Sequence, residues 1–284
     1  MGHAMRRDWT RNELVVVFNL YCKIPFAKTK ATNPAVIEIA RIIGRTPAAV
    51  AMKLGNFGSF DPALRAKGIS GLSRASKTDQ EIWSEFNGDW EGLAVESELA
   101  TEQLVSSVRK HQTISQSVKQ RIDRFLKGEQ VTKGPSEIRR EVKVRLQQRF
   151  FRDAVLASYR VACCVCSNPV RELLAAGHII PWSIREDLRA NPRNGLCLCS
   201  LHHDAFDAGF WCVDDSYKIL LASQLCDYKP NRAIELNFFQ YAGADLHLPD
   251  KFWPEQVFLA RHRQSIFRGQ THASSNPLKY RGKL

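Results

Sequence analysis

The sequence lacks the features that would place a protein in or across a membrane. None of its 284 residues lies in an apolar run approaching the length of about 18 residues that a membrane span requires. The opening residues Met1–Met5 carry no signal-peptide pattern and are typical of a cloning remnant, so we leave His3 out of consideration. Internal repeats and low-complexity tracts are also missing. These absences predict a cytoplasmic, globular protein with no membrane partner.

Acidic residues are scarce relative to basic ones. Lys and Arg number 41 against 29 Asp and Glu, a formal net charge of +12. This surplus favours a polyanionic partner, because each neutralised phosphate releases counterions, although a basic surface kept for solubility is an alternative. The charge is concentrated between Arg139 and Arg152, where Glu141 is the only acidic residue. In this stretch the DNA-contact candidates are Arg145, Arg149 and Arg152.

The eight cysteines do not form the spaced pattern of a disulfide framework. Six of them fall between Cys163 and Cys212, mixed with histidines, in a chain without an export signal. This clustering indicates a reducing compartment and metal binding in place of disulfides.

The first hundred residues have the start and stop signals of short helices. Asn33-Pro34 and Thr46-Pro47 each place a capping residue before a proline, and Gly44 separates the two predicted helices. This outline is that of a helix-turn-helix, in which the helix over residues 47–56 would contact DNA. The DNA-contact candidates here are Arg45, Lys53 and Asn56. Tight helix pairs are also common packing units, so both interpretations stay open.

A different pattern follows the polar segment that ends at Lys133-Gly134-Pro135. A basic amphipathic helix is predicted from Ser136 towards Tyr159, with Val142, Leu146, Phe150 and Val155 as core contacts. Residues 163–221 then alternate short apolar runs with turns, which predicts a strand, a loop, a second strand, a helix and a hairpin.

Four short motifs stand in order within this region. They are Cys163–Cys166, Gly177–Trp182, Asn194–Cys199 and Leu201–Asp207. Because the histidine, asparagine and histidine signals arrive in this order, the region resembles the HNH endonuclease family, and within it the branch of restriction-like bacterial nucleases. The resemblance covers residues 137–221 and implies a ββα-metal fold that hydrolyses phosphodiester bonds in DNA.

The whole chain is therefore expected to have an α+β fold. We predict an all-helical, helix-turn-helix-like domain over residues 1–95, a helical connector over 96–135, and an HNH domain with a C-terminal extension over 136–284. The N-terminal domain would select the target.

The resemblance implies a role for each residue of the motifs. His178 would be the general base, since an imidazole titrates near physiological pH. Asn194 would hold that base across its loop, although asparagine before glycine is also ordinary turn chemistry. His203 and Asp207, four residues apart on a helix, would bind a catalytic Mg²⁺ or Mn²⁺. His203 thereby joins His178 and Asn194 as a catalytic residue.

One position departs from the family pattern. Many relatives place an Asp or His just before the base as another metal ligand, where this chain has Gly177. Either the two helix residues suffice, or a residue from elsewhere contributes, with Glu172 the nearest carboxylate.

A second metal site is predicted from cysteine spacing. Cys163 with Cys166, and Cys199 with His202, are two pairs that would close a tetrahedral, structural Zn²⁺ site. Many HNH nucleases have a four-cysteine zinc site at this place. Cysteine is also frequent as a small buried hydrophobe, and that alternative stays open.

Three functions remain under consideration. The favoured one is a bacterial restriction or phage-defence endonuclease that acts on double-stranded DNA, and a double-strand cut by one site per chain would favour a homodimer. A zinc-stabilised DNA-binding regulator without catalysis is the second, and Gly177 supports it. An RNA nuclease is the third, because the metal chemistry is indifferent to the sugar.

Overall fold

The computed structural model describes residues 7–69, 75–109 and 135–269. Contacts divide the chain into two compact units. Unit 1 comprises Met1–Ser200 and His247–Glu255, and unit 2 comprises Leu201–Leu246 and Gln256–Leu284. The domain boundaries near residues 95 and 135 stay a prediction.

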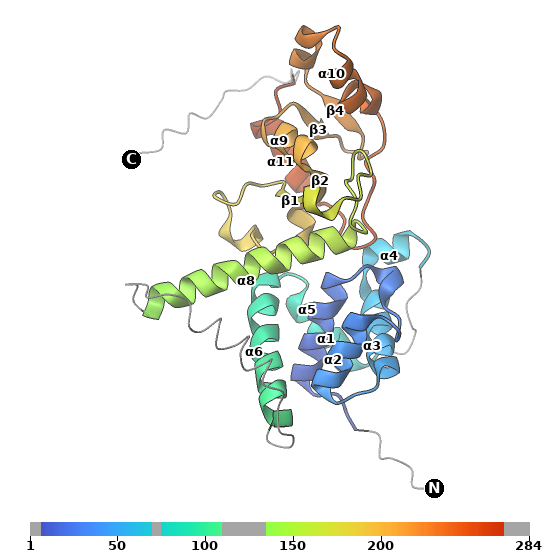
Figure 1. The fold of residues 1–284 in the computed structure, drawn as a ribbon, viewed down its shortest axis with the longest axis vertical. Helices are drawn as coiled ribbons and strands as arrows, with labels where there is room; N and C mark the ends of the chain where they lie inside the picture. Colours follow the sequence, from blue (N-terminus) through green and yellow to red (C-terminus); the bar gives the residue numbers. More distant parts are fainter. Residues whose placement is uncertain (1–6, 70–74, 110–134, 270–284) are drawn as a thin grey trace. The chain divides into compact units, whose positions relative to one another are not determined.

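Unit 1 begins with a group of helices (Figure 1). They are α1 (Arg11–Lys23), η1 (Phe26–Lys28), α2 (Pro34–Ile43), α3 (Pro47–Phe60), α4 (Pro62–Ala66), α5 (Lys77–Phe86) and α6 (Trp90–Arg109). Thr10 and Glu13 form a capping box at α1, and Asn33 and Thr46 cap α2 and α3. Gly44 ends α2 in the left-handed conformation at φ 65°, which glycine adopts without steric cost. The local signals in the sequence therefore place these helices correctly.

Aromatic side chains fill the core of these helices. The ring centroid of Phe18 lies 4.9 Å from that of Phe57 and 5.4 Å from that of Trp83. Phe86 and Trp90 are 1% and 2% exposed. Aromatic contacts of this kind add to the burial of apolar area, so the core is well specified.

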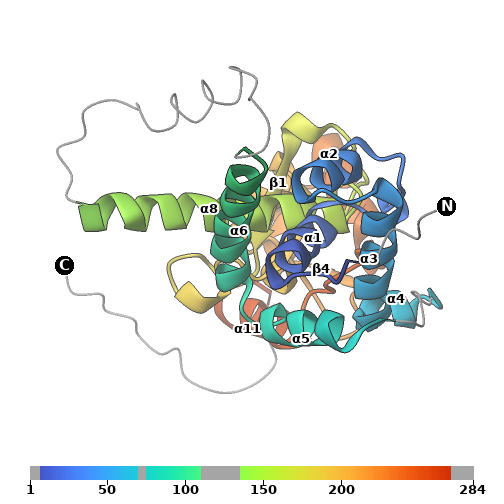
Figure 2. The same ribbon diagram turned by 90° about the horizontal axis from the view of Figure 1, so that it is seen from below.

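The second part of unit 1 joins a long helix to a two-stranded sheet. Its elements are α8 (Pro135–Ser158), η2 (Arg171–Leu173), β1 (Leu174–His178), η3 (Glu186–Leu188), η4 (Pro192–Asn194) and β2 (Gly195–Cys199). The strands are antiparallel, with Leu174 opposite Cys199 and His178 opposite Gly195. Helix α8 contacts both strands, and it also contacts α1 and α6, which it crosses in Figure 2. Val142 on α8 is 37% exposed, so its predicted core position is wrong, because the buried part of α8 starts further along the helix.

The segment His247–Glu255 returns to unit 1 and is fixed there by two charged residues. The fully buried Lys251 donates to the carbonyl groups that end α1, including Ile24 O at 2.8 Å, and burial lowers the pKa of Lys251 to about 8. Asp250 accepts from Arg160 at 2.6 Å. The carbonyl end of a helix attracts a cation, so this segment caps α1.

Unit 2 continues the helix that starts at the last residue of unit 1. Its elements are α9 (Ser200–Asp207), β3 (Trp211–Val213), β4 (Ile219–Leu221), η5 (Ser223–Tyr228), α10 (Arg232–Asn237), η6 (Phe239–Tyr241) and α11 (Gln256–Ser265). Strands β3 and β4 form the predicted hairpin. His262 of α11 stacks on Phe206 with ring centroids 3.7 Å apart and is 1% exposed. It is therefore a packing residue of unit 2.

The observed elements confirm the expected α+β fold class, with a mostly helical N-terminal region and small two-stranded sheets. The helical connector predicted for 96–135 starts within α6, and residues 110–134 of it lie outside the described residues. Within the described ranges, no helix has both the length and the apolar character needed to cross a membrane.

Candidate functional site

His178 stands at the end of β1 with its ring held on three sides. The ring stacks on Phe151 at 3.7 Å between centroids and meets the edge of Trp182 at 5.4 Å. Its Nε2 lies 3.0 Å from the carbonyl oxygen of Arg189. A carbonyl oxygen only accepts hydrogen bonds, so Nε2 carries the proton in the neutral ring, and the lone pair is on Nδ1. Nδ1 is therefore the atom that can take a proton.

The carbonyl that orients His178 is itself held in place. The Arg189 side chain donates from Nε to the carbonyl of Trp182 at 3.1 Å, and its guanidinium lies 4.8 Å from the centre of the Trp182 ring. Glu186 pairs with the same guanidinium at 3.2 Å. Sequence reasoning missed Arg189, because a backbone carbonyl that orients a histidine leaves no residue signature.

Asn194 joins the end of β1 to the loop that precedes β2. It is fully buried, and its Oδ1 accepts from the N–H of Ile180 at 2.8 Å. Its Nδ2 donates to Ile180 O at 3.1 Å, and its backbone carbonyl accepts from Ile179 N at 2.9 Å. The amide thus fixes the backbone directly after His178, which is the geometry expected of a positioning residue.

Gly195 explains why glycine follows that asparagine. A Cβ at this position would lie 2.4 Å from Val155 Cγ2 and 2.9 Å from Phe151 Cζ, both on α8. A larger residue would push β2 away from the helix that also stacks on His178. Glycine at position 195 is therefore required by close packing here.

The predicted metal pair lies on one face of α9. His203 Nε2 is 3.5 Å from Asp207 Oδ2, and His203 Nδ1 is 3.9 Å from Asp204 Oδ1. Burial raises the pKa of Asp207, with the Asp204 carboxylate adding to the rise and His203 opposing it. An imidazole and a carboxylate at this separation are a suitable donor pair for a divalent cation.

Among the described residues, no third protein ligand accompanies that pair. Across the described part of the chain, the one group of three or more potential metal ligands is the cysteine–histidine cluster. Gly177 is a buried residue of β1 without a side chain, and Glu172 is exposed in η2. A cation at His203 and Asp207 would therefore take its remaining ligands from water and substrate.

The four predicted zinc ligands do come together. The ligand atoms of Cys163, Cys166, Cys199 and His202 all lie within 4.8 Å of one another. Cys166 Sγ and Cys199 Sγ are 3.9 Å apart, close to the separation of about 3.7 Å expected for two sulfurs at 2.3 Å from a tetrahedral zinc. The cluster can hold a metal such as zinc.

The orientation of His202 is fixed by a residue that sequence reasoning missed. His202 Nε2 lies 2.9 Å from the carbonyl oxygen of Asn237 at the end of α10. This carbonyl places the proton on Nε2, so Nδ1 is the ligand atom that His202 would offer.

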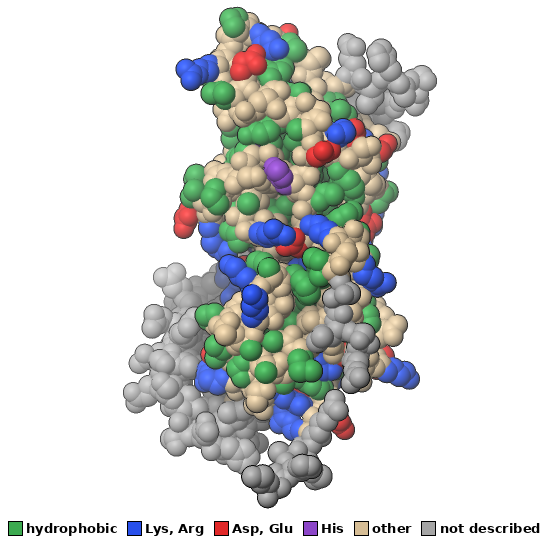
Figure 3. Space-filling model, turned by 90° about the vertical axis from the view of Figure 1, so that its right-hand side faces the viewer, with side chains coloured by type: hydrophobic (Ala, Val, Ile, Leu, Met, Phe, Trp, Pro, Cys, Tyr) green, Lys and Arg blue, Asp and Glu red, His purple; other side chains and the backbone are tan. Residues whose placement is uncertain are grey.

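Three basic candidates on α8 are available to a partner. Arg145, Arg149 and Arg152 are exposed, and their spacing of four and three residues places them on one side of the helix. Within the described part of the chain, the acidic partner of Arg149 is Asp153, at the long distance of 4.0 Å. On the face drawn in Figure 3, Lys and Arg side chains are spread over the surface with acidic side chains among them.

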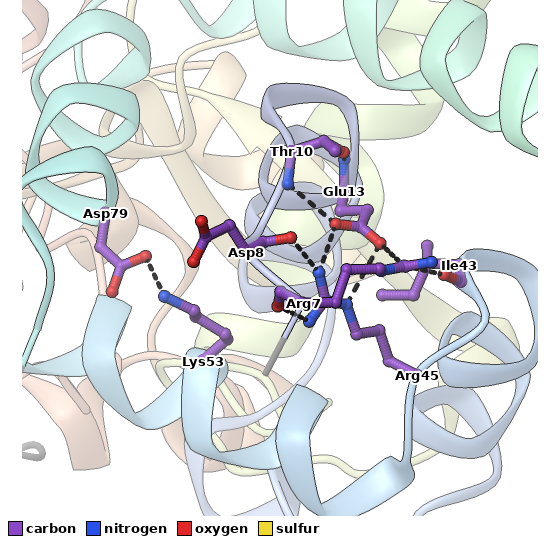
Figure 4. Close-up of polar contacts among 8 residues, drawn as sticks. All are labelled: Arg7, Asp8, Thr10, Glu13, Ile43, Arg45, Lys53 and Asp79. Atoms are coloured by element: carbon purple, nitrogen blue, oxygen red, sulfur yellow. Dashed lines mark hydrogen bonds and ion pairs between the residues drawn. The ribbon is translucent and has the colours of Figure 1, made fainter. Parts of the chain in front are cut away.

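The N-terminal candidates are instead engaged within unit 1 (Figure 4). Arg45 binds both oxygens of Glu13, at 2.9 and 3.2 Å, and donates to the carbonyl of Arg7 at 2.7 Å. Burial acts to raise the pKa of Glu13, but hydrogen bonds from Arg45 and the Thr10 N–H outweigh it and lower that pKa. Arg45 therefore joins the start of α1 to the turn between α2 and α3.

Lys53 and Asn56 are engaged in the same way. Lys53 Nζ lies 2.6 Å from Asp79 Oδ1, and Asn56 Nδ2 donates to Asp79 Oδ2 at 2.9 Å. Lys53 and Asn56 are each 8% exposed, and Asp79 is fully buried. The structure thus gives these two residues and Arg45 a packing role, and we do not carry them forward as DNA contacts.

Replacing Glu13 with glutamine is expected to destabilise the protein by about 2–3 kcal/mol at pH 7, because buried hydrogen bonds to charged partners weaken. The folded-state pKa of Glu13 lies below its unfolded value of about 4.3, so its contribution is present above that pH and is lost as the pH falls through the folded-state pKa.

Urea denaturation midpoints of the wild type and the variant should therefore converge as the pH falls through the lowered folded-state pKa of Glu13. The exposed Glu38, paired with Arg41 on α2, is the matched control, and Glu38→Gln should change stability by less than about 0.5 kcal/mol. A pH-independent difference for Glu13→Gln would contradict this account.

The comparisons with known proteins agree with the geometry. Residues 163–214 match the model of the HNH endonuclease family. No curated protein matches the chain. The matched stretch contains His178, Asn194, His203 and Asp207 together with the cysteine–histidine cluster, and it indicates a nuclease with a nucleic-acid substrate. Residues 163–214 of this chain are therefore similar to the HNH endonuclease family.

Proposed function

We propose that the protein is a metal-dependent endonuclease that hydrolyses phosphodiester bonds in double-stranded DNA. The observation that carries the proposal is the environment of His178. Its Nε2 lies 3.0 Å from the Arg189 carbonyl oxygen, which places the lone pair of the neutral ring on Nδ1, the nitrogen that would accept a proton. A packing histidine can have the same contact, as His262 does with the Phe206 carbonyl at 3.1 Å, but His178 also lies in the stretch that matches the HNH endonuclease family and next to the backbone that Asn194 holds.

The proposed reaction is a single displacement at phosphorus. His178 Nδ1 takes a proton from a water molecule while the water oxygen attacks the phosphorus atom, and the bond to the leaving oxygen then breaks. Asn194 holds the backbone after His178, so the imidazole cannot move away from the attacking water. Mg²⁺ or Mn²⁺ bound to His203 and Asp207 would supply the charge that stabilises the phosphorane and the leaving oxygen.

The proposal extends to the DNA backbone, the structural metal and the cellular role of the enzyme. The exposed Arg145, Arg149 and Arg152 would bind backbone phosphates, and binding is then expected to weaken as salt increases. We propose Zn²⁺ for the cysteine–histidine cluster, with the thiols kept reduced in a cytoplasm. A bacterial restriction or defence role, with target selection by the N-terminal helices and a homodimer for double-strand cuts, is the setting we favour.

Supercoiled plasmid DNA tests the proposal directly. The purified protein is incubated with plasmid from modifying and non-modifying hosts in Mg²⁺, Mn²⁺ or EDTA, and with a structured RNA in parallel. We expect metal-dependent nicking or linearisation of the plasmid, which EDTA stops. Cleavage of RNA alone would establish an RNA nuclease instead.

A catalytically silent DNA-binding regulator is the second candidate. Gly177 in place of a ligand, and the lack of a third protein ligand within the described residues, favour it. Plasmid that is shifted in a gel but left uncut in every metal would support this regulator.

Replacing Asn194 with alanine is expected to lower the cleavage rate by about 10- to 100-fold, the usual effect of removing a group that orients a catalytic ligand. Ile180 N would also lose its acceptor, at a cost of about 1–3 kcal/mol in stability. Cleavage is therefore measured well below the melting temperature. Asn191, which accepts from Arg193 N at 2.9 Å in the same loop, is the matched control. Equal rates for the two variants would contradict the positioning role.

A further inference from the structure

The loop that follows β1 touches the ring of His178 at two separate points. Trp182 meets the ring edge-on, with 5.4 Å between centroids, and the carbonyl oxygen of Arg189 lies 3.0 Å from His178 Nε2. Trp182 and Arg189 are seven positions apart in the sequence. Closing a loop costs conformational entropy, so both contacts persist only if another interaction holds the two points together.

The side chain of Arg189 provides that interaction. Its Nε donates to the carbonyl of Trp182 at 3.1 Å, and its guanidinium lies 4.8 Å from the centre of the Trp182 ring. The side chain is 18% exposed, so water competes little for these contacts. A hydrogen bond from a charged donor is stronger than a neutral one, and a cation over an indole ring adds to it. Arg189 therefore offers His178 its backbone carbonyl and uses its side chain to hold the other contact point of the loop.

The other hydrogen bonds of this loop are local. Three of its backbone hydrogen bonds join residues three positions apart, and their donors are Ile184, Leu188 and Arg189. These bonds shape the turns of the loop but do not join position 182 to position 189. Asn194 Nδ2 reaches Leu188 O at 3.5 Å, which is long for a hydrogen bond. The bond from Arg189 Nε to the Trp182 carbonyl therefore spans the part of the loop that these contacts leave open.

The ion pair of Arg189 does not account for its position. Glu186 pairs with Nη1 at 3.2 Å, and the Glu186 side chain is 74% exposed. An exposed pair of this kind contributes little, so the contacts with Trp182 are the ones that hold the guanidinium. These contacts also distinguish Arg189 from the exposed arginines of α8, because its guanidinium is engaged inside the loop and is not presented to a partner.

We propose that the side chain of Arg189 is a positioning residue for His178, because it holds the carbonyl oxygen that orients the imidazole. The tautomer of a neutral histidine is set by the hydrogen bond that one of its nitrogens makes. If the Arg189 carbonyl moves away, Nε2 loses its acceptor, and the proton is shared between the two nitrogens. The effect on cleavage rests on the proposed nuclease function, whereas the effect on the tautomer does not.

Nitrogen-15 NMR of the full chain with labelled histidine reads the tautomer without any cleavage. The signals of His178 are those missing from the spectrum of His178→Ala, and they are recorded at a pH at which the ring is neutral. We expect the wild type to carry the proton on Nε2. Arg189→Met keeps an unbranched side chain but lacks Nε, and we expect it to give averaged signals of the two tautomers.

Cleavage kinetics separate positioning from DNA binding. Arg189→Met is expected to lower kcat about 10-fold, as loss of an orienting group does, with KM unchanged. Arg189→Lys keeps the charge but also lacks Nε, so it should lower kcat as well, and it replaces the methionine variant if that variant does not fold. Arg185→Met is the matched control, since Arg185 is exposed in the same loop and binds only Asp187 among the described residues, at 2.7 Å.

A double variant tests whether Arg189 acts through His178. Once the imidazole is gone, a residue that only positions it has nothing left to contribute. His178→Ala combined with Arg189→Met should therefore cleave at the residual rate of His178→Ala alone, because residues that act as a unit are not additive. A further loss of about 10-fold in the double variant would overturn the proposal, since Arg189 would then act independently of the base.

The remaining outcomes decide the proposal as follows. Averaged tautomer signals in Arg189→Met, with a lower kcat and a constant KM, support it. A wild-type tautomer in that variant overturns it, and so does a higher KM with an unchanged kcat, which would make Arg189 a DNA contact. A wild type that cleaves no substrate would refute the nuclease function, and the tautomer signals would still decide the role of Arg189.

Discussion

Replacing His178 with alanine is expected to lower the rate of plasmid cleavage by a factor of about 10²–10⁴, the usual contribution of a general base. The variant lacks the Nδ1 lone pair that the Arg189 carbonyl directs towards proton transfer. DNA binding should persist, because the exposed arginines of α8 are unchanged. Cleavage and gel-shift titrations of the same preparation measure the two properties separately.

A packing role for His178 predicts different behaviour. The ring stacks on Phe151, so its removal leaves a cavity that can also loosen the end of β1. Added imidazole fills that cavity and restores a base, and a partial recovery of cleavage would identify proton transfer as the lost function. His247→Ala, an exposed histidine in unit 1, is the matched control and should cleave at the wild-type rate.

Two outcomes of the His178→Ala experiment would contradict the role of this residue as the general base. If His178→Ala retains cleavage within a factor of about ten, the base lies elsewhere, because a positioned general base contributes at least about 10². Loss of both cleavage and DNA binding, without rescue by imidazole, would leave His178 as a structural residue.

The parts of the fold that the sequence predicted are those governed by neighbouring residues. The capping box of Thr10 and Glu13, and the left-handed Gly44, are set by local backbone chemistry, so the helix ends follow from them. The order of strands and helix around His178 could be predicted for the same reason. Val142 could not, because its exposure depends on where α8 meets the rest of unit 1.

The candidate site residues differ in the same way: some depend on local spacing, and others depend on partners that are distant in sequence. The cysteine–histidine spacing was informative because two ligands separated by two residues can lie on one side of a turn, and the four ligand atoms do come within 4.8 Å of one another. Lys53 and Asn56 were misleading, because the fully buried Asp79 that engages them comes from α5, distant in sequence. A polar residue on a predicted recognition helix does not reveal which carboxylate of the fold lies opposite.

The backbone groups that orient the two histidines could not be predicted from the sequence. The carbonyls of Arg189 and Asn237 orient His178 and His202, and any residue type offers a carbonyl. Tertiary structure supplies these contacts, and they set the tautomers on which the proposed chemistry depends.

Replacing Cys166 with serine is expected to abolish zinc binding and to lower the melting temperature by more than about 10 °C. A structural zinc contributes an apparent binding free energy of about 10–16 kcal/mol in small domains, as large as the whole stability of most proteins. Cys166 and Cys199 stand 3.9 Å apart at the turn before β1 and at the end of β2, so loss of the ion would release both.

Metal analysis and thermal melts measure the two effects. The wild type should carry about one zinc ion per chain, as a four-ligand site requires, and a chelator should lower its melting temperature. Cys226→Ser is the matched control, since Cys226 is an exposed free thiol in η5 outside the cluster. Cys166→Ser should melt at the same temperature with and without the chelator.

The alternative treats the cluster as a buried apolar contact of free thiols. It predicts a wild type without bound zinc, no effect of the chelator, and a small loss of stability for Cys166→Ser, because Cys166 is only partly buried. The His202 contact argues for the metal. Its Nε2 is bound to the Asn237 carbonyl at 2.9 Å, which makes Nδ1 the nitrogen that His202 would offer to a metal, and the four ligand atoms of the cluster lie within 4.8 Å of one another. Zinc satisfies all four groups at once, and the melting experiment decides between them.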